Sequence, residues 1–312
     1  MKALVTGGAG FIGSHVVDAY LAEGLEVAVV DDLSRGRREN VSPRARFYQV
    51  DILDRAVLES VFAQERPDLV NHQAAQMDVR RSVTEPIFDA QSNILGSINV
   101  LDLAVKHQCP RVVYASSGGA VYGEPKALPA NEETPVRPLA PYGISKHTVE
   151  HYLFNYRHLY GVTFVVLRYG NVYGPRQSSK GEAGVVAIFA EQIIAGTTPT
   201  IYGDGSKTRD YVEVSDVVRA NVRTLDSGDD QIFNIATGVP TTDYQVFTHV
   251  RDALGVPSLV PNYAPFRPGE VNHIYLDVCK AKLGLDWEPE VTIGEGIRRT
   301  AEWFFRHRDG DQ

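Results

Sequence analysis

A glycine-rich segment near the N-terminus constrains the fold of this chain more than any other feature of its sequence. The segment follows a short apolar run, Ala3–Val5, and reads Gly7-Gly8-Ala9-Gly10-Phe11-Ile12-Gly13. Its last three glycines have the spacing Gly-x-Gly-x-x-Gly, which permits a tight turn from a strand into a helix and lets backbone amides approach a pyrophosphate. The alternative is a turn that merely joins a strand to a helix. The segment therefore predicts a dinucleotide site if later parts of the chain supply its other elements.

Acidic residues after the next two expected strands are candidates for further contacts to the dinucleotide. A second apolar run, Glu26–Val30, leads into Asp31. A carboxylate at this place accepts hydrogen bonds from the ribose hydroxyls of NAD and repels the 2′-phosphate of NADP. Asp32 directly follows, so which of the two carboxylates binds the ribose stays open, and an aspartate that only forms a turn is the alternative. Three nearby arginines, Arg35, Arg37 and Arg38, weaken the preference for NAD over NADP. We predict NAD as the cofactor, with Asp51-Ile52 after the third strand in contact with its adenine.

Apolar runs alternate with amphipathic stretches throughout the first half of the chain. This alternation is typical of a parallel sheet that helices cover on both faces. The expected strands are Ala3–Val5, Glu26–Val30, Leu69–Val70 with its flanks, Val112–Ala115 and Thr163–Leu167, and the expected helices are Ser14–Glu23, Arg55–Glu65, Phe88–His107 and Ile144–Tyr160. We predict an α/β fold, a doubly wound parallel sheet of the Rossmann type.

The rhythm changes near residue 170, after which glycine, proline and loops become frequent. Residues 1–170 are predicted to form the Rossmann lobe that binds NAD, and residues 171–312 a second, smaller lobe. The second lobe is expected to contain helices at Val246–Leu254 and Ile293–Phe305. Two later strands, Arg209–Val214 and Gln231–Ile235, are expected to return to the first sheet, so that residues 211–237 would belong to the first lobe.

Composition excludes several classes of protein. The formal net charge of −8 disfavours non-specific binding to nucleic acid, so any phosphate site must be built locally. Only two cysteines occur, Cys109 and Cys279, which excludes a disulfide framework and a cysteine-rich zinc site, and we expect no metal. No stretch is apolar enough to span a membrane, and we expect no signal peptide before the first strand. We therefore expect a cytoplasmic protein.

A tyrosine and a lysine four residues apart form the best catalytic candidate. They lie in the string Tyr142-Gly143-Ile144-Ser145-Lys146 and would share one face at the start of a helix. A tyrosine has an ordinary pKa near 10, and a lysine cation beside it would lower that value toward neutrality. A plain surface helix is the alternative. The glycine turn, together with Ser116-Ser117 at the end of an upstream strand, favours catalysis.

Several strings together resemble one family. They are Thr6–Gly13, Asp31, Asn93, Ser116–Gly123, Tyr142–Lys146, Leu167–Asn171, Arg209-Asp210-Tyr211 and Arg267–Glu270. They resemble the extended short-chain dehydrogenases that act on nucleotide sugars, and most closely the UDP-galactose (UDP-glucose) 4-epimerases. The resemblance covers nearly the whole chain. It implies an NAD lobe, a smaller lobe that binds the nucleotide sugar, and an active site between them.

The resemblance also implies roles for individual residues. Tyr142 would act as the base at the 4-hydroxyl of a UDP-hexose while NAD transiently oxidises carbon 4, and the 4-keto sugar would present its other face before reduction. Lys146 would hold the nicotinamide ribose and keep Tyr142 acidic. The implied NAD contacts are Gly7, Gly10, Phe11, Ile12, Gly13, Asp31, Asp32, Asp51, Ile52, Asn93, Tyr142 and Lys146.

In the second lobe the resemblance implies a UDP site. Arg209 and Arg267 would neutralise the diphosphate, which suits the forked donors of arginine. Asn171 would donate to the diphosphate, Glu270 would hold the uridine ribose, and Thr200 and Tyr202 would flank the uracil. Ile274 falls where related enzymes carry a side chain that gates the second carbon of the sugar, although a simple core residue is the alternative.

The sequence departs from the family at one important place. The family usually has Ser or Thr, which bonds the sugar's 4-hydroxyl, where this chain has Gly118. Ser117 or a water would then take over the role, or Tyr142 would act directly. Gly119 and Ala120 stand where dehydratases of the family carry an acid–base pair, which disfavours elimination. Other functions remain open. The substrate of a 4-epimerase could be UDP-glucuronate or a UDP-N-acetylhexosamine, the chain could catalyse another reaction of the family, or it could be a non-catalytic NAD sensor.

Two of the expected helices predict a homodimer. Phe88–His107 and Ile144–Tyr160 carry apolar residues on more than one face, whereas a helix that covers only a sheet needs one stripe. These residues are Ile94, Ile98, Leu101 and Val105 in the first helix, and Ile144, Val149, Leu153 and Tyr156 in the second. The family pairs these helices with their copies in a second subunit.

Overall fold

A seven-stranded parallel sheet forms the centre of the molecule in this computed structural model, which describes residues 1–178, 184–266 and 271–307. The strand order is β10-β6-β5-β4-β1-β2-β3, and every neighbouring pair is parallel. The strands are β1 (Lys2–Thr6), β2 (Glu26–Asp31), β3 (Arg46–Gln49), β4 (Leu69–His72), β5 (Arg111–Ser117), β6 (Thr163–Tyr169) and β10 (Gln231–Ile235). The predicted doubly wound Rossmann-type sheet is confirmed.

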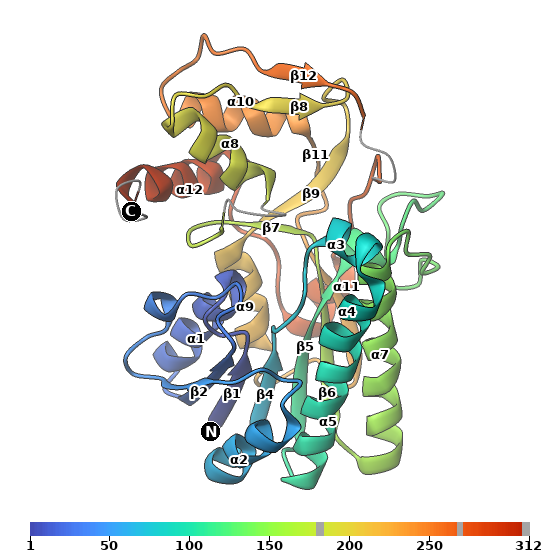
Figure 1. Ribbon diagram of the computed structural model, residues 1–312. Coiled ribbons are helices and arrows are strands. Elements are labelled where there is room, and N and C mark those ends of the chain that lie inside the picture. Colours follow the sequence, from blue (N-terminus) through green and yellow to red (C-terminus); the bar gives the residue numbers. More distant parts are fainter. Residues whose placement is uncertain (179–183, 267–270, 308–312) are drawn as a thin grey trace.

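Helices cover both faces of this sheet (Figure 1). One face packs against α1 (Phe11–Ala22), α9 (Val214–Arg223) and α11 (Cys279–Leu285). The other packs against α2 (Arg55–Glu65), α5 (Gly96–Lys106) and α7 (Pro141–Tyr160). The central strands are almost wholly buried, as expected of continuous apolar runs between two helical layers. The short elements η1 (Arg38–Asn40), α3 (Val79–Thr84), α4 (Pro86–Ala90) and α6 (Gly118–Val121) lie in the connections.

The predicted helix Phe88–His107 is helical in the structure from Pro86 to Lys106, but a π turn interrupts its α-helical geometry. The chain forms α4, then a π turn, η2 (Gln91–Leu95), and then α5. A π turn adds one residue to a helical turn and shifts the face on which later side chains lie. The apolar pattern of the sequence does not reveal this shift.

The apolar residues of the two helices from which a homodimer is predicted lie on different faces in the structure. Leu101, Val149, Leu153 and Tyr156 are buried in the core of the single chain, and Val105 packs against it. These five side chains therefore belong to the core of the single chain. The large apolar residues that these helices expose are Ile87 on α4, Leu95 on η2, and Ile144, Phe154, Leu159 and Tyr160 on α7.

The second part of the molecule lies at the carboxyl edge of the sheet (Figure 1). It holds a three-stranded sheet of β11 (Pro240–Thr242), β9 (Thr208–Glu213) and β7 (Asn171–Tyr173), and a two-stranded sheet of β12 (Asn262–Ala264) and β8 (Thr200–Tyr202). Helices α8 (Val185–Ile194), α10 (Asp243–Ala253) and α12 (Ile293–His307) share a separate apolar core. No helix among the described residues is long and apolar enough to cross a membrane.

The expectation for the two late strands is half right. Gln231–Ile235 does join the first sheet, as β10 beside β6. The strand expected at Arg209–Val214 does not join it, because β9 pairs with β7 and β11 instead. An apolar run predicts a strand but carries no information about its distant partner.

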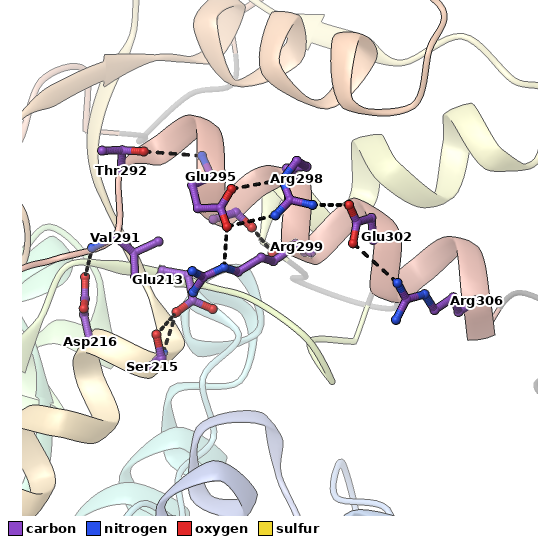
Figure 2. A network of polar contacts seen from close by, with 12 residues as sticks. Glu213, Ser215, Asp216, Val291, Thr292, Glu295, Arg298, Arg299, Glu302 and Arg306 are labelled. Carbon is purple, nitrogen blue, oxygen red and sulfur yellow. Dashed lines mark hydrogen bonds and ion pairs between the residues drawn. The ribbon is translucent and has the colours of Figure 1, made fainter.

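Polar contacts fix α12 to the rest of the molecule (Figure 2). Asp216, fully buried at the start of α9, accepts hydrogen bonds from the backbone amides of Glu290 and Val291 just before α12. Along α12, Glu295, Arg298, Glu302 and Arg306 form ion pairs at spacings of three and four residues. We call these four residues the α12 ladder.

Candidate active site

A cavity of about 1180 Å³ runs along the carboxyl edge of the sheet. It begins at the turn between β1 and α1, passes the ends of β2 and β5, and reaches α8 and α12. It brings together many of the residues predicted for NAD and catalysis, namely Gly7, Gly10, Phe11, Ile12, Gly13, Asp31, Asp32, Asp51, Ile52, Tyr142 and Lys146. The carboxyl edge of a parallel sheet is where folds of this type bind ligands.

The glycine turn has no room for side chains. Gly7 has a φ of +69°, and a Cβ there would lie 2.6 Å from the backbone nitrogen of Ala74. A Cβ at Gly13 would lie 2.1 Å from the carbonyl oxygen of Gly7. Gly10 precedes α1 without capping its first amides, so these donors face the cavity at the positive end of the helix. This cradle fits the pyrophosphate of a dinucleotide.

Asp31 connects the end of β2 to the glycine turn. Its carboxylate accepts hydrogen bonds from the backbone amides of Ala9, at 3.0 Å, and Leu33, at 2.9 Å. Burial raises the pKa of Asp31, and these hydrogen bonds oppose the rise. Asp32 instead accepts hydrogen bonds from its neighbour Ser34. Asp31 is thus the carboxylate that is fixed beside the glycine turn.

Asn93 does not line the cavity, although it was predicted to bind the cofactor. Its side-chain oxygen accepts a hydrogen bond from the backbone amide of Gln76. Its side-chain nitrogen donates to the backbone carbonyl of Gln76 and to the carboxylate of Asp89, the latter at 3.0 Å. Gln76 does line the cavity. Asn93 therefore positions the cavity wall from behind.

Tyr142 and Lys146 lie in the first turns of α7 and both line the cavity. Lys146 is buried and donates a hydrogen bond from Nζ to the carbonyl oxygen of Ala115 at 2.8 Å. Its Nζ lies 6.0 Å from the centre of the Tyr142 ring. Burial lowers the pKa of Lys146, and the charges of Asp89 and Glu150 oppose part of this effect. The resulting pKa is about 8. At neutral pH the lysine is therefore still mostly a cation beside the tyrosine.

Two buried carboxylates near Lys146 escaped sequence reasoning. Asp89 accepts hydrogen bonds from Ser145 Oγ at 2.6 Å and from Gln76 Nε2 at 3.1 Å. Glu150 forms a buried ion pair with Arg168 on β6 at 2.6 Å. Glu150 lies four residues after Lys146, and that repeat of the Tyr142–Lys146 spacing is a signal that could have found it. No local pattern points to Asp89 or Arg168.

Glu150 is the centre of a wider network. Its carboxylate also accepts hydrogen bonds from Ser116 Oγ at 2.6 Å and pairs with His147 Nδ1 at 2.9 Å. Burial alone would raise the pKa of Glu150, but the bonds from Arg168, His147 and Ser116 lower it to about 2. The carboxylate is therefore charged, and it ties α7 to the ends of β5 and β6.

Comparisons with known proteins match this arrangement. The family model described as "NAD dependent epimerase/dehydratase family" matches residues 3–236. The chain belongs to that family. The family is NAD dependent, so the prediction of NAD is confirmed, and the predicted relation to extended short-chain dehydrogenases that act on nucleotide sugars is confirmed as well.

Relatives of known name within the family are similar over their whole length. A UDP-glucose 4-epimerase of Mycolicibacterium smegmatis is 46% identical, over 99% of this chain and 99% of the relative. The crystal structure of a UDP-glucose 4-epimerase from Thermotoga maritima with UDP-glucose has a TM-score of 0.97 at 46% identity, covering 99% of this chain and 100% of that one. A Thermus thermophilus UDP-glucose 4-epimerase in complex with NAD has a TM-score of 0.92 at 46% identity, covering 97% and 99%.

Four of the residues that family resemblance assigned to the UDP portion do not line the cavity, namely Asn171, Thr200, Tyr202 and Arg209. Asn171 begins β7, and Thr200 and Tyr202 are the ends of β8. Arg209 on β9 donates hydrogen bonds to the carbonyl oxygens of Val271 and Asn272. Arg267 and Glu270 lie outside the described residues.

Ile274 and Gly118 share one apolar region. Ile274 is almost fully buried in a cluster with Tyr122 and Leu276, and it does not line the cavity. A Cβ on Gly118 would lie 2.4 Å from Cδ1 of Leu276. The leucine thus occupies the space into which the family's usual Ser or Thr would project, which is a physical reason for glycine. Ser117, next to it, does not line the cavity either.

Proposed function

We propose that this family member is a UDP-glucose 4-epimerase, which interconverts UDP-galactose and UDP-glucose with NAD as a bound prosthetic group. The observation that carries the proposal is the placement of Tyr142 and Lys146 in the same cavity as the glycine turn and Asp31. Full-length similarity to enzymes of that name supports it. Gly119 and Ala120, which cannot act as acid or base, favour epimerisation over dehydration.

The side chains of this site can perform the proton transfers of the reaction. Tyr142, kept acidic by the cation of Lys146, takes the proton of the sugar's 4-hydroxyl and later returns it. Bound NAD supplies the oxidation of carbon 4 and its reversal. Asp89 and Glu150 keep Lys146 charged in spite of its burial. Turnover then requires the 4-keto sugar to expose its other face to the same tyrosine.

We infer that the second lobe, residues 171–312, holds the UDP portion. Arg209, Arg267 and Asn171 would bind the diphosphate, Glu270 the ribose, and Thr200 and Tyr202 the uracil. The guanidinium of Arg209 holds carbonyl oxygens at Val271 and Asn272, directly after Arg267–Glu270 in the chain. These hydrogen bonds join β9 to residues 271 and 272, which directly follow the proposed ligands in the sequence, and this supports the proposal.

Direct action of Tyr142 is the account that we favour for the 4-hydroxyl. Gly118 offers no hydroxyl, and the nearby Leu276 leaves little room for one. If Ser117 had taken the role, Ser117→Ala would lower turnover severely with NAD content unchanged. If Tyr142 acts directly, Ser117→Ala has a small effect and Gly118→Ser does not improve turnover.

The proposed reaction is tested by incubating the purified protein with UDP-galactose and measuring UDP-glucose by chromatography, without added NADH. Conversion in both directions to one equilibrium mixture supports the proposal. Turnover of UDP-glucuronate or UDP-N-acetylgalactosamine with none of UDP-galactose would assign a different 4-epimerase. Binding of NAD with no conversion of any UDP-sugar would instead indicate a sensor.

Ile274→Tyr, assayed with UDP-glucose and UDP-N-acetylglucosamine, tests the proposed gate at the second carbon of the sugar. Equal loss of turnover for both substrates would make Ile274 a core residue only.

We also propose that the enzyme is a cytoplasmic homodimer. Ile87, Leu95, Ile144 and Phe154 are between 51% and 75% exposed, on α4, η2 and α7. Apolar side chains gathered on neighbouring helices favour burial against a second copy. Light scattering at micromolar concentration should give the mass of two chains, and Phe154→Glu should shift it toward one.

A further inference from the structure

Two histidines on the catalytic helix point their ring nitrogens at each other. His147 and His151 lie one turn apart on α7, and their Nε2 atoms are 3.1 Å apart. Their ring centroids are 4.5 Å apart, with the planes at 67°. Neither ring is enclosed, since the side chain of His147 is 28% exposed and His151 is an exposed residue. The proposed reaction uses neither histidine.

Glu150 fixes the protonation pattern of His147. The buried carboxylate accepts a hydrogen bond from Nδ1 of His147 at 2.9 Å, and it forms an ion pair with Arg168 at 2.6 Å. In the neutral ring the proton therefore lies on Nδ1, so Nε2 offers a lone pair toward His151. A carboxylate behind a histidine is the usual outer arrangement of metal-binding imidazoles, because it orients the ring and strengthens the ligand.

The distance between the two nitrogens suits one metal ion. Zinc binds imidazole nitrogen at roughly 2.0–2.1 Å, and tetrahedral angles then place two such nitrogens roughly 3.3 Å apart. The observed 3.1 Å needs only a small change in side-chain torsions. Without metal, Nε2–H of His151 donates to His147. With metal, the proton of His151 moves from Nε2 to Nδ1, so both Nε2 atoms bind the ion and the ring stays neutral.

We propose that His147 and His151 form a binding site for a divalent transition-metal ion, with Glu150 as the hydrogen-bond partner behind His147. Neutral imidazoles select Zn²⁺, Ni²⁺ or Cu²⁺ over Mg²⁺ and Ca²⁺. Across the described parts of the chain, no group of three or more His, Cys, Asp or Glu side chains could hold a metal. The pair therefore supplies two ligands, and water completes the coordination.

Metal at this place would clamp one turn of the helix that carries Tyr142 and Lys146. Through Glu150 the clamp is continuous with Arg168 and Ser116, so the ion reinforces the attachment of α7 to the sheet. An ion that binds the folded chain and not the unfolded one raises stability with its concentration. The expected consequence is thermal stabilisation by Zn²⁺, with no requirement for Zn²⁺ in turnover.

Binding is tested on the complete chain, without an affinity tag and with its NAD, by calorimetric titration with Zn²⁺. We expect saturable binding that His151→Gln weakens by about tenfold or more, because one of two protein ligands is lost. His158→Gln, an exposed histidine further along α7, is the matched control and should bind as the wild type does. Zn²⁺ should raise the Tm of the wild type and of His158→Gln, and not that of His151→Gln.

Electron paramagnetic resonance with Cu²⁺ identifies the ligands. Two imidazole nitrogens should couple to the copper in the wild type and fewer in His151→Gln.

Ile144 and Phe154, which belong to the proposed dimer surface, flank the two histidines along the helix. The molar mass is therefore measured with and without Zn²⁺. One ion per chain, or one per two chains, supports the site provided that His151→Gln removes it. Equal Zn²⁺ affinity in the wild type and His151→Gln, or no saturable binding in the wild type, overturns the proposal.

Discussion

Both α7 and α12 carry carboxylate–guanidinium ion pairs, but the pair of α7 is buried whereas those of α12 are exposed to water. The Glu150–Arg168 pair behind the active site leaves only 3% of each side chain exposed. In the α12 ladder the exposure runs from 37% at Glu295 to 74% at Arg306 (Figure 2). The buried pair has further fixed partners in Ser116, His147 and Tyr122. The ion pairs of the ladder within the described part of the chain join residues of α12 to one another.

The difference shows where charge in this molecule determines geometry. A buried charge has no water to replace a lost partner, so each member of the pair requires the other. An exposed charge finds water or another side chain, and salt screens its pairing. Charges behind the active site can therefore fix the positions of catalytic groups, whereas those on α12 mainly keep a helix face hydrated.

The largest effect on stability is expected from breaking the buried pair. Glu150→Ala leaves Arg168 buried without its carboxylate, which should lower the free energy of unfolding by about 3–5 kcal/mol. Urea denaturation followed by circular dichroism measures this. The double variant Glu150→Ala/Arg168→Met removes both charges and should recover part of the loss. A single variant as stable as the wild type would contradict the role of Glu150 as the centre of the network.

Removal of the catalytic hydroxyl should affect turnover and leave folding intact. Tyr142→Phe is expected to reduce kcat roughly a hundredfold or more, which is the usual scale for loss of a general base. NAD content and the urea midpoint should stay at wild-type values, in contrast to Glu150→Ala. Nearly full activity in Tyr142→Phe would overturn the mechanism.

The pH dependence of the site should follow Lys146. Its folded pKa of about 8 lies below the ordinary 10.5 because of burial, so the cation that keeps Tyr142 acidic is lost as pH rises through 8. Activity should therefore fall on the alkaline side. Stability has the opposite sign, since the unfolded chain binds more protons between pH 8 and 10.5 and stability rises there with pH.

A second carboxylate sharpens this test. Asp89→Asn removes the charge that most raises the pKa of Lys146, so the alkaline fall in activity should move to lower pH. Ser145→Ala removes a hydrogen bond to Asp89 but keeps its charge, and should leave the pH profile almost unmoved. Equal profiles for Asp89→Asn and the wild type would show that Asp89 does not sustain the cation.

The sequence predicts well whatever depends on neighbouring residues. Helix Arg55–Glu65 and strand Gln231–Ile235 have the predicted bounds, because their apolar periodicity and end signals are local. Tyr142 and Lys146 were found because their four-residue spacing is local as well. The partners of β9 and the ion pair of Glu150 with Arg168 arise from contacts between distant segments. Pattern alone does not specify such contacts.

The smallest effect is expected in the α12 ladder. Arg298 contacts Glu295 and Glu302, so its loss leaves two carboxylates, yet both are substantially exposed to water. Glu295 also keeps a second partner in Arg299, at 2.8 Å. Arg298→Ala should therefore leave the urea midpoint within experimental error of the wild type, and added NaCl should erase any residual difference. If the midpoint instead fell as far as in Glu150→Ala and stayed low in high salt, exposure would not be what separates the two helices. The α12 ladder would then have to act through the buried Asp216 of α9, which accepts hydrogen bonds from the backbone amides of Glu290 and Val291 just before α12.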